Sequence, residues 1–451
     1  MRLLLFLAQC AFGFSLRHTL RLSASSESFA FDGSGVRMAR DAWGGSGLVS
    51  TRAFKAGDTL CTIPLSMCLL ARRDGVICTG LKGQSDAVWD VAGDLREPIA
   101  ESDEKLVTWD LRLAFALLEA TAGSSLATAG SFWDNYTGAL PQPASLTLPF
   151  CFSDVCLEET HDEELVARAK NQKARLSNFA VLDVPGWHRC AMDSGALTWA
   201  FALVRSRCFA LAPDYFAVVP IIDIANHSPA PNSEFLVVGS SLENGACIIR
   251  ARQDIALETP ILIEYDAQAD TQYDNRRLFT QYGFTLSGNG ASSSHQEDFK
   301  SDEQIIAPGS DKAAVIDWLV DAVIVLDVER ERAQSAAIEL GRRIRAQPAD
   351  SSAAQIVSSL RGDLLAELAA IEQRFTSFEA DSILLNTLNA GQSTWVNRAT
   401  GEDCEPSDPF ALNRLQFAAA VRYRLEPKAD LRVSLTLLQA LADHGKFVIE
   451  D

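Results

Sequence analysis

The sequence lacks the features that mark several large classes of protein. No Cys-x-x-Cys pair occurs among its ten cysteines, so a structural zinc site is not expected. The cysteines are scattered, mostly inside apolar runs, so a disulfide framework is not expected either. It has no glycine-rich phosphate loop of the Walker or Rossmann pattern and no G-x-S-x-G nucleophile elbow. Past the N-terminus, no apolar run approaches the roughly 18 residues that a membrane span needs. These absences argue against a metal centre, a nucleotide-cofactor domain of those types and a membrane-spanning mature chain.

Positive charge is also scarce. Lys and Arg number 40 against 59 Asp and Glu, which gives a net charge of −19. Because a protein that binds nucleic-acid backbones has a basic footprint, the composition argues against a nucleic-acid partner. An acidic surface would instead attract a protein segment that carries Lys or Arg. With 451 residues, 47% of them apolar, the chain is long enough for about three units with packed cores.

One targeting signal is present, at the N-terminus. Arg2 precedes a short apolar run at 3–8, and residues 16–31 contain Arg and Ser with a single acid, Glu27. A secretory-type leader followed by a Ser/Arg-rich stretch is typical of proteins sent to complex plastids. We therefore expect a leader over residues 1–31 and a plastid location. The alternatives are a frayed terminus of a cytoplasmic protein and retention in a secretory lumen.

The hydrophobic pattern beyond the leader alternates between strand-like and helical regions. Short alternating runs predict strands in residues 34–82 and again in 206–286. The expected strands are 48–54, 59–63, 216–222, 234–238, 246–251 and 260–265. The turn at Lys55–Asp58 is expected to join the first two of these as a hairpin.

Helical periodicity fills an insertion at about 86–205 and the C-terminal third of the chain. Within the insertion, helices are expected at 106–122, 158–179 and 194–209, the last running just past its end. An exposed linker is expected at 287–311. In residues 312–451 we expect a long helix at 313–345 and two further helices at 412–425 and 431–443. The predicted fold is α+β: a β core at 32–286, split by the helical insertion and followed by an all-α domain.

Three separated segments carry the chemistry-bearing residues. The first is the glycine-rich turn Gly44-Gly45-Ser46-Gly47, the second is Asp223-Ile224-Ala225-Asn226-His227-Ser228, and the third is a strand that ends in Tyr265, followed by Asn275 and then Tyr282-Gly283-Phe284. Here the sequence resembles the SET-domain protein methyltransferases of the Rubisco large-subunit lysine methyltransferase type, a group that includes actin-histidine methyltransferase.

Two further segments extend the resemblance to about residues 34–450. Ser131-Phe132-Trp133 with Leu140-Pro141 matches the helical insertion of that group, and residues 420–425 match its helical substrate-binding tail. The resemblance implies a SET domain at 32–286 and a substrate-binding domain of the Rubisco-methyltransferase type at 312–451. It also implies S-adenosylmethionine (SAM) as the cofactor.

The resemblance also assigns site residues. Those that it places at the cofactor are Gly44, Gly45, Ser46, Gly47, Arg207, Asp223, Asn226, His227 and Tyr265. Glycine suits a cofactor pocket because a ligand can approach its main chain closely. The catalytic residues are Tyr265, at the methyl-transfer channel, and Tyr282, which lines the acceptor pocket.

Methyl transfer from a sulfonium requires alignment and exclusion of water rather than a built nucleophile. The acceptor amine must be neutral, and a lysine pKa near 10.4 leaves about 3 pK units, or about 4 kcal/mol, against reaction near neutral pH. A narrow apolar channel beside a sulfonium lowers that pKa by desolvation and by like charge. We therefore expect the acidic residues to lie on the outer surface, away from the channel.

The predicted function is SAM-dependent protein N-methylation, with lysine in a basic segment favoured as the acceptor. One alternative is protein-histidine methylation. Another is a catalytically silent SET-like binding module, suggested by Gly44 and Ser46 where the family often has an acidic and an aromatic residue. An insertion at Gln268–Tyr273 is a second departure from the family pattern. Analogy within the family suggests the Rubisco large subunit or a fructose-bisphosphate aldolase as the substrate.

Overall fold

The computed structural model describes residues 35–40, 46–73, 108–121, 133, 136, 139–180, 194–212, 214–239, 245–265, 273–289, 310–325, 330–348 and 350–441. Four of the sequence predictions fall on residues outside these ranges: the leader at 1–31, the glycines Gly44 and Gly45, most of the linker at 287–311, and all but the last residue of the insertion at Gln268–Tyr273.

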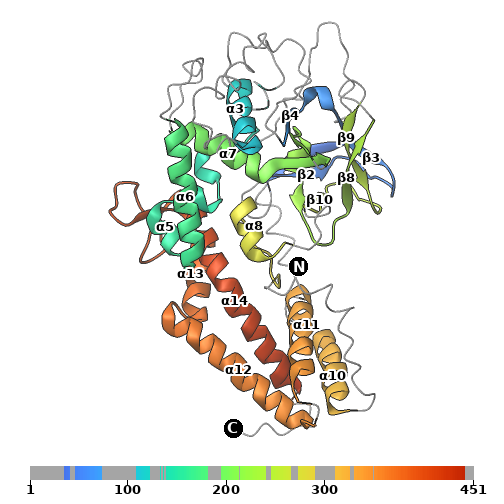
Figure 1. Cartoon of the computed structure of the whole chain (residues 1–451), viewed down its shortest axis with the longest axis vertical. Coiled ribbons are helices and arrows are strands. Elements are labelled where there is room, and N and C mark those ends of the chain that lie inside the picture. The colour runs from blue at the N-terminus through green and yellow to red at the C-terminus, as the bar shows by residue number, and fades with distance from the viewer. Residues whose placement is uncertain are drawn as a thin grey trace.

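Three small sheets of the described chain lie together at the upper end of Figure 1. Their strands are β1 (Val36–Arg40), β2 (Ser46–Ser50), β3 (Thr59–Pro64), β4 (Leu69–Arg72), β5 (Cys208–Ala212), β6 (Tyr215–Val218), β7 (Asn226–His227), β8 (Ser233–Val238), β9 (Ala246–Ala251) and β10 (Pro260–Ile263). The strand orders are β1-β2-β10-β7, β3-β9-β8 and β4-β6-β5. Each sheet therefore joins strands from before and after the helical insertion, as predicted for a split β core.

The predicted hairpin around Lys55–Asp58 is only half right. The turn forms, with the Asp58 N–H donating to the Lys55 carbonyl at 3.0 Å and Gly57 at φ 91°. The flanking strands do not pair with each other, since β2 lies between β1 and β10 whereas β3 pairs with β9. The hairpin was wrong because the flanking strands take other partners: β2 pairs along its length with the strand just before it, and β3 pairs with a strand far along the chain.

Helices fill the described part of the insertion, as predicted. They are α3 (Trp109–Thr121), α5 (Asp154–Glu158), α6 (Glu163–Ala180) and α7 (Ser194–Arg207). The segment predicted as one helix from 158 is divided, because His161 adopts φ 55° between α5 and α6. Such a positive φ is incompatible with a continuous right-handed helix.

The C-terminal region is helical, with three corrections to the prediction. The first is that the long helix expected at 313–345 is two helices, one ending at Val325 and the next beginning at Arg330. Its helices are α10 (Asp311–Val325), α11 (Arg330–Ala346), α12 (Ala353–Arg374), α13 (Phe378–Ala390) and α14 (Arg414–Leu441). A two-stranded ribbon of β11 (Trp395–Asn397) and β12 (Ala411–Asn413) means that the region is not all-α. The helices predicted at 412–425 and 431–443 are one continuous helix, α14, which passes through Pro427. Among the described residues, none of the helices is both long and apolar enough to cross a membrane.

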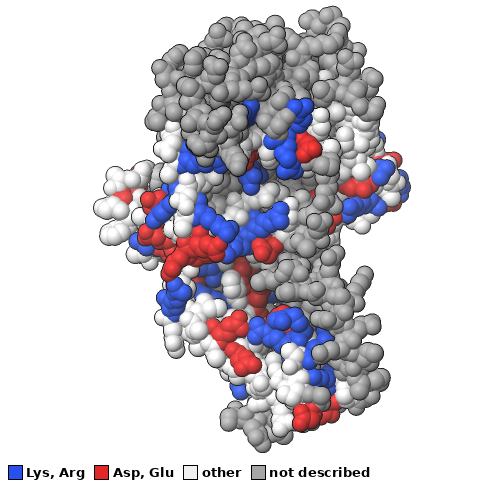
Figure 2. Space-filling model, viewed as in Figure 1, with Lys and Arg blue, Asp and Glu red and all other residues white. Residues whose placement is uncertain are grey.

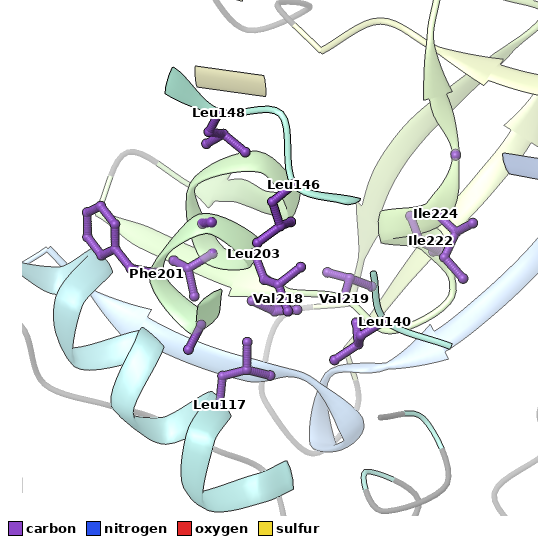
Figure 3. Packing of buried hydrophobic residues seen from close by; sticks show 14 of the residues in the cluster. Leu117, Leu140, Leu146, Leu148, Phe201, Leu203, Val218, Val219, Ile222 and Ile224 are labelled. Carbon is purple, nitrogen blue, oxygen red and sulfur yellow. The ribbon is translucent and has the colours of Figure 1, made fainter. Parts of the chain in front are cut away.

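The helix α14 connects two separate hydrophobic cores. Its first half contributes Phe417, Ala420 and Val421 to an upper core shared with the sheets and the insertion. Its second half contributes Leu431 and Leu437 to a lower core shared with α10, α11 and α12. In Figure 1 the helix runs from the middle of the molecule to its lower end. Figure 3 shows part of the upper core, where side chains from α3 and α7 meet those that follow β6.

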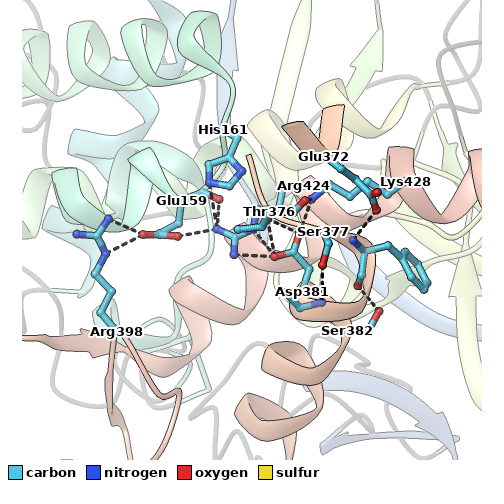
Figure 4. Close-up of polar contacts among 12 residues, drawn as sticks. Glu159, His161, Glu372, Thr376, Ser377, Asp381, Ser382, Arg398, Arg424 and Lys428 are labelled. Atoms are coloured by element: carbon cyan, nitrogen blue, oxygen red, sulfur yellow. Dashed lines mark hydrogen bonds and ion pairs between the residues drawn. The ribbon is translucent and has the colours of Figure 1, made fainter. Parts of the chain in front are cut away.

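A buried polar network lies where the two cores adjoin (Figure 4). Asp381 on α13 is fully buried and accepts hydrogen bonds from Arg424 at 2.8 Å and from Lys428 at 2.6 Å. Arg424 also donates to Glu159, at 2.6 Å, and so links α14 to the helical insertion. We call Glu159, Asp381, Arg424 and Lys428 the junction network. Each of its charges faces at least one opposite charge, as burial of ions requires.

Charges of both signs are interleaved on the face shown in Figure 2. Acidic and basic side chains lie next to one another across its middle. Among the ion pairs of the described residues, Arg276 pairs with Asp162 and Glu164, and Arg374 pairs with Glu163. On this face the acidic excess of the sequence therefore does not form one continuous acidic field.

Candidate methyl-transfer site

The four-stranded sheet β1-β2-β10-β7 brings two of the three predicted segments into contact. β2 pairs with β10, and β10 pairs in parallel with β7 so that Leu262 lies beside Asn226 and Ile263 beside His227. Gly47 in β2 faces the side chain of Asn226. A Cβ atom at Gly47 would lie 2.8 Å from the Asn226 amide nitrogen, closer than real Cβ contacts allow. Glycine leaves room here for the Asn226 amide, which a Cβ atom would push aside, and Ser46 lies one residue earlier at the start of β2.

Tyr265 joins the third segment to this contact. Its hydroxyl donates to the Ala225 carbonyl at 2.8 Å, and its backbone N–H donates to Nδ1 of His227 at 3.1 Å. Because Nδ1 accepts a hydrogen bond, the proton of a neutral His227 ring resides on Nε2. Two hydrogen bonds thus fix Tyr265 against the residues on either side of Asn226.

Aromatic rings surround Tyr265. The ring centroid of Tyr282 lies 4.8 Å from that of Tyr265, and those of His227 and Phe284 lie at 5.2 and 6.3 Å. We call these four residues the aromatic cluster. Tilted rings at such separations attract one another through their quadrupoles in addition to burying apolar area.

The helix α8 (Asn275–Tyr282) positions two members of the cluster. Asp274 caps its N-terminus by accepting from the Arg277 N–H at 2.7 Å. Gly283 ends it with φ 82°, and a Cβ there would meet the backbone of Thr147 at 2.6 Å. The glycine of the Tyr-Gly-Phe motif thus has a structural role: it ends the helix in a turn that lets both Tyr282 and Phe284 lie near Tyr265.

Asp223 lies fully buried beside this site. Its Oδ1 accepts from the hydroxyl of Tyr136, and the Arg207 guanidinium donates to its backbone carbonyl at 2.9 Å. Burial raises the pKa of the Asp223 carboxyl to about 6, although Arg207 and the Tyr136 hydroxyl oppose that rise. The prediction that acids keep to the outer surface thus has an exception in Asp223, whose charge is offset by Arg207, 3.9 Å from Oδ2.

The two tyrosines of the cluster remain protonated near neutral pH. Burial raises the pKa of Tyr265 to about 12 and that of Tyr282 still further above its usual range. Neither phenol can therefore serve as a general base at physiological pH. The Tyr265 hydroxyl already donates its proton to Ala225, so its oxygen presents lone pairs to any group in front of it.

The donor set fits a cofactor that carries positive charge and an amino-acid end. Asp223 Oδ2 is buried and, within the described residues, accepts no hydrogen bond. The Asn226 amide lies against Gly47, where it can offer both a donor and an acceptor to a ligand. Of the nine residues assigned to SAM from the sequence, the structure brings Gly47, Arg207, Asp223, Asn226, His227 and Tyr265 together. The assignment of Gly44 and Gly45 stays a prediction, because they lie outside the described residues.

Two residues that shape the site were given no role from the sequence. The side-chain amide of Asn275 donates to the Leu286 carbonyl and accepts from the Leu286 N–H, both at 2.8 Å. These two hydrogen bonds hold the chain that follows Phe284. Tyr136 contacts Asp223 from 87 positions away. Asn275 was noted only as part of a motif, and nothing local to Tyr136 marks its distant partner.

A cleft of about 1020 Å³ lies at the other end of α8. Asp274, Asn275 and Arg276 line it from one side, and residues of α11, α12 and α14 line it from the others. It is separate from the aromatic cluster, which lies at the Tyr282 end of the helix.

Comparisons with known proteins return SET-domain names. No protein-family model matches the chain. The human protein "SET domain-containing protein 4" is 26% identical over 174 residues, which cover 34% of this chain and only 37% of that relative. Solved structures with a related arrangement include the SET domain of LSMT bound to lysine and AdoHcy, with a TM-score of 0.46, 16% identity, and 91% of this chain and 88% of that chain covered. Its complex with MeLysine and AdoHcy has a TM-score of 0.46 and 16% identity over 94% and 91% of the two chains.

Proposed function

We propose that this chain is a SET-type protein N-methyltransferase that uses SAM and methylates a lysine side chain in a basic segment of another protein. The observation that carries the proposal is the placement of Tyr265: its hydroxyl is tied to the Ala225 carbonyl next to the Gly47–Asn226 contact, within an aromatic cluster. The motifs resemble a methyltransferase family, and the curated relative bears a SET-domain name.

The aromatic cluster suits the activation of an amine. An ammonium group that enters an apolar, ring-lined space loses hydration, which lowers its pKa and favours the neutral nucleophile. The Tyr265 oxygen can accept a hydrogen bond from the remaining N–H and so orient the nitrogen lone pair. Tyr282 and Phe284 exclude water around the same position, and no residue needs to form a covalent intermediate.

Bound SAM supplies a methyl group that is already activated on a sulfonium. The residues placed to hold it are the backbone around Gly47 and the side chain of Asn226, with His227 beyond. Arg207 and Asp223 lie behind them and provide one positive and one negative group. In this proposal Gly44, Gly45 and Ser46 extend the same pocket.

Lysine is proposed over histidine because its amine has the higher pKa and so needs the most help to lose its proton before methylation. An apolar, ring-lined site gives that help by lowering the pKa of the amine. The leader-like N-terminus makes plastid proteins the first substrates to test. The Rubisco large subunit and a fructose-bisphosphate aldolase head that set by family analogy.

Two experiments test the proposal together. Calorimetric titration with SAM should give saturable binding, and tritiated-methyl labelling of a plastid-containing lysate should yield a labelled band whose mass spectrum contains methyl-lysine. Methyl-histidine in that band would replace lysine by histidine as the acceptor. Absence of SAM binding even at millimolar cofactor would overturn the enzymatic proposal in favour of a silent binding module.

Substitution of Tyr265 tests its role in the transfer. Tyr265→Phe removes one hydroxyl while keeping the ring, so kcat should fall about 10- to 1,000-fold, and the Kd for SAM should stay within a few-fold. Tyr215→Phe at the start of β6, where the side chain is exposed, is the matched control and should leave turnover unchanged. Equal turnover of Tyr265→Phe and the control would remove Tyr265 from the mechanism.

A further inference from the structure

We infer that Tyr136, in the helical insertion, is a positioning residue for methyl transfer: its hydroxyl clamps a strained turn that sets the chain at Ala225–His227. The inference rests on the proposed function and adds to it a residue that touches neither methyl donor nor acceptor. It starts from the Ser131–Tyr136 segment, of which the family resemblance uses only the first three residues.

The turn held by Tyr136 is strained. Ile221 has φ 71° and ψ −51°, close to the γ-turn conformation that L-residues rarely adopt. For a β-branched side chain a positive φ is a true outlier, because Cβ crowds the backbone. Such a conformation persists only where the surroundings over-determine it.

Two hydrogen bonds of the Tyr136 hydroxyl, one accepted and one donated, hold the turn in this conformation. The Ile221 N–H donates to the Tyr136 oxygen at 3.1 Å, and the Tyr136 O–H donates to the Asp223 carboxylate. The hydroxyl therefore spans the turn from its first residue to its third. Tyr136 is 1% exposed, so both hydrogen bonds form in a buried setting of low dielectric, where they are stronger than in water.

The turn connects directly to the proposed site. Ile222–Ile224 form a short 3₁₀ helix, after which the Ala225 carbonyl accepts the hydroxyl of Tyr265. The next residue, Asn226, packs against Gly47. A shift of the Ile221 turn would therefore move the acceptor of the Tyr265 hydroxyl and the cofactor contact together.

Tyr136 is itself rigidly placed. Its ring meets that of Trp133 edge-to-face with centroids 5.6 Å apart, and the Trp133 indole N–H donates to the Met67 carbonyl at 3.2 Å. The clamp is thereby anchored to the short 3₁₀ turn before β4 as well as to the insertion. A mobile tyrosine could not hold a strained turn, whereas this one is fixed on both sides.

The clamp also affects a proton equilibrium. The titratable and charged groups that face Asp223 are Tyr136, Arg207, Tyr265 and Cys68. Burial raises the pKa of Asp223, and both Arg207 and the Tyr136 hydroxyl lower it. Loss of the hydroxyl should therefore raise the Asp223 pKa further, so that the carboxylate is protonated at a higher pH.

The test compares Tyr136→Phe with Tyr423→Phe. Tyr423 donates to Asp162 at 2.8 Å and so offers the same loss of a Tyr–Asp hydrogen bond away from the turn. In Tyr136→Phe we expect amide exchange in Ile221–His227 to speed up about 10-fold more than in the control. We also expect a kcat about 10-fold lower with little change in SAM affinity, and an acid limb of the pH–rate profile that moves to higher pH.

A second variant keeps the inference testable if Tyr136→Phe is poorly folded. Ile221→Gly relieves the strain, since glycine adopts positive φ freely. Removal of the Tyr136 hydroxyl should then cost much less kcat in the Ile221→Gly background than in the natural chain. Equal costs in both backgrounds would overturn the positioning role.

The exchange measurement separates this inference from the proposed function. If the natural protein neither binds SAM nor transfers methyl groups, the function fails, while local exchange still decides whether Tyr136 holds the turn. Exchange in Ile221–His227 that matches the Tyr423→Phe control would overturn the clamp, whatever the catalytic result.

Discussion

The upper and lower hydrophobic cores are built from different residues. The lower core consists of buried aliphatic side chains such as Val315, Leu340, Ile356 and Leu437, and its described buried set contains no aromatic residue. The upper core contains Trp133, Tyr136, Phe152, Phe201, Phe279 and Phe417 among its buried members. Both are well packed, so the difference concerns the backbone that each must enclose.

The upper core encloses irregular backbone, and its aromatic residues carry polar handles that satisfy it. The indole of Trp133 donates to the Met67 carbonyl, that of Trp199 donates to the Pro141 carbonyl at 2.8 Å, and Tyr136 bridges a strained turn. Helices pair their backbone N–H and C=O groups internally, so the side chains of the lower core only have to fill space and need no polar atoms. The comparison indicates that irregular chain near a site is held by buried side chains with one polar atom.

The junction network decides whether the two cores behave as one unit. Asp381→Ala should have the largest effect, because it leaves Lys428 and part of Arg424 buried without their carboxylate. We expect a loss of about 3 to 5 kcal/mol in the free energy of unfolding, measured by urea denaturation. Glu367→Ala, which breaks a surface ion pair with Arg343, should cost less than about 1 kcal/mol. If the two variants prove equally stable, the network does not join the cores.

Matched core truncations should separate the two cores. Leu437 and Leu203 are both almost fully buried, in the lower and upper core respectively. Each leucine-to-alanine change should cost about 3 kcal/mol. Near-UV circular dichroism, to which the upper core contributes most of the buried rings, should survive mild denaturant in Leu437→Ala but not in Leu203→Ala. Identical loss of this signal in both variants would mean that the cores unfold as one.

Acidification should weaken the junction by a smaller amount. Burial lowers the pKa of His161 to about 4, and its ring stacks on Phe375 with centroids 4.4 Å apart. The unfolded chain, with a His pKa near 6.5, binds the proton first, so this contribution is present above about pH 6.5 and is lost as the pH falls toward 4. The urea midpoint should therefore drop between neutral and mildly acidic pH. His161→Phe keeps the stacking without titrating; a drop of the same size in this variant would assign the effect to other groups.

Local patterns in the sequence predicted local structure well. The strand at Ala246–Ala251 has the predicted bounds, because Arg250 faces outward while Cys247 and Ile249 face the core in alternation. The motif residues Tyr265 and Tyr282 contact each other, as do Asn226 and Gly47, while their roles in binding and catalysis stay predictions. In each case the signal is a short motif whose residues act together.

Long-range partners were beyond the sequence patterns. The turn at Lys55–Asp58 could not reveal that β3 pairs with β9, nearly 190 positions later. Two helices were expected at 412–425 and 431–443, yet Phe417 and Leu431 are buried in two different cores, and α14 runs unbroken between them through Pro427. Tyr136 carries no local mark of Asp223. In each case the local sequence did not reveal which distant residues the segment would contact.

The continuity of α14 constrains its length. Each residue of an α-helix advances the face by about 100°, so one inserted or deleted residue between Val421 and Leu431 would turn all later side chains by that angle. Leu431, Leu437 and Leu441 would then point away from the helices they now pack against. The number of residues in the middle of this helix is therefore fixed by the two cores that its ends must reach.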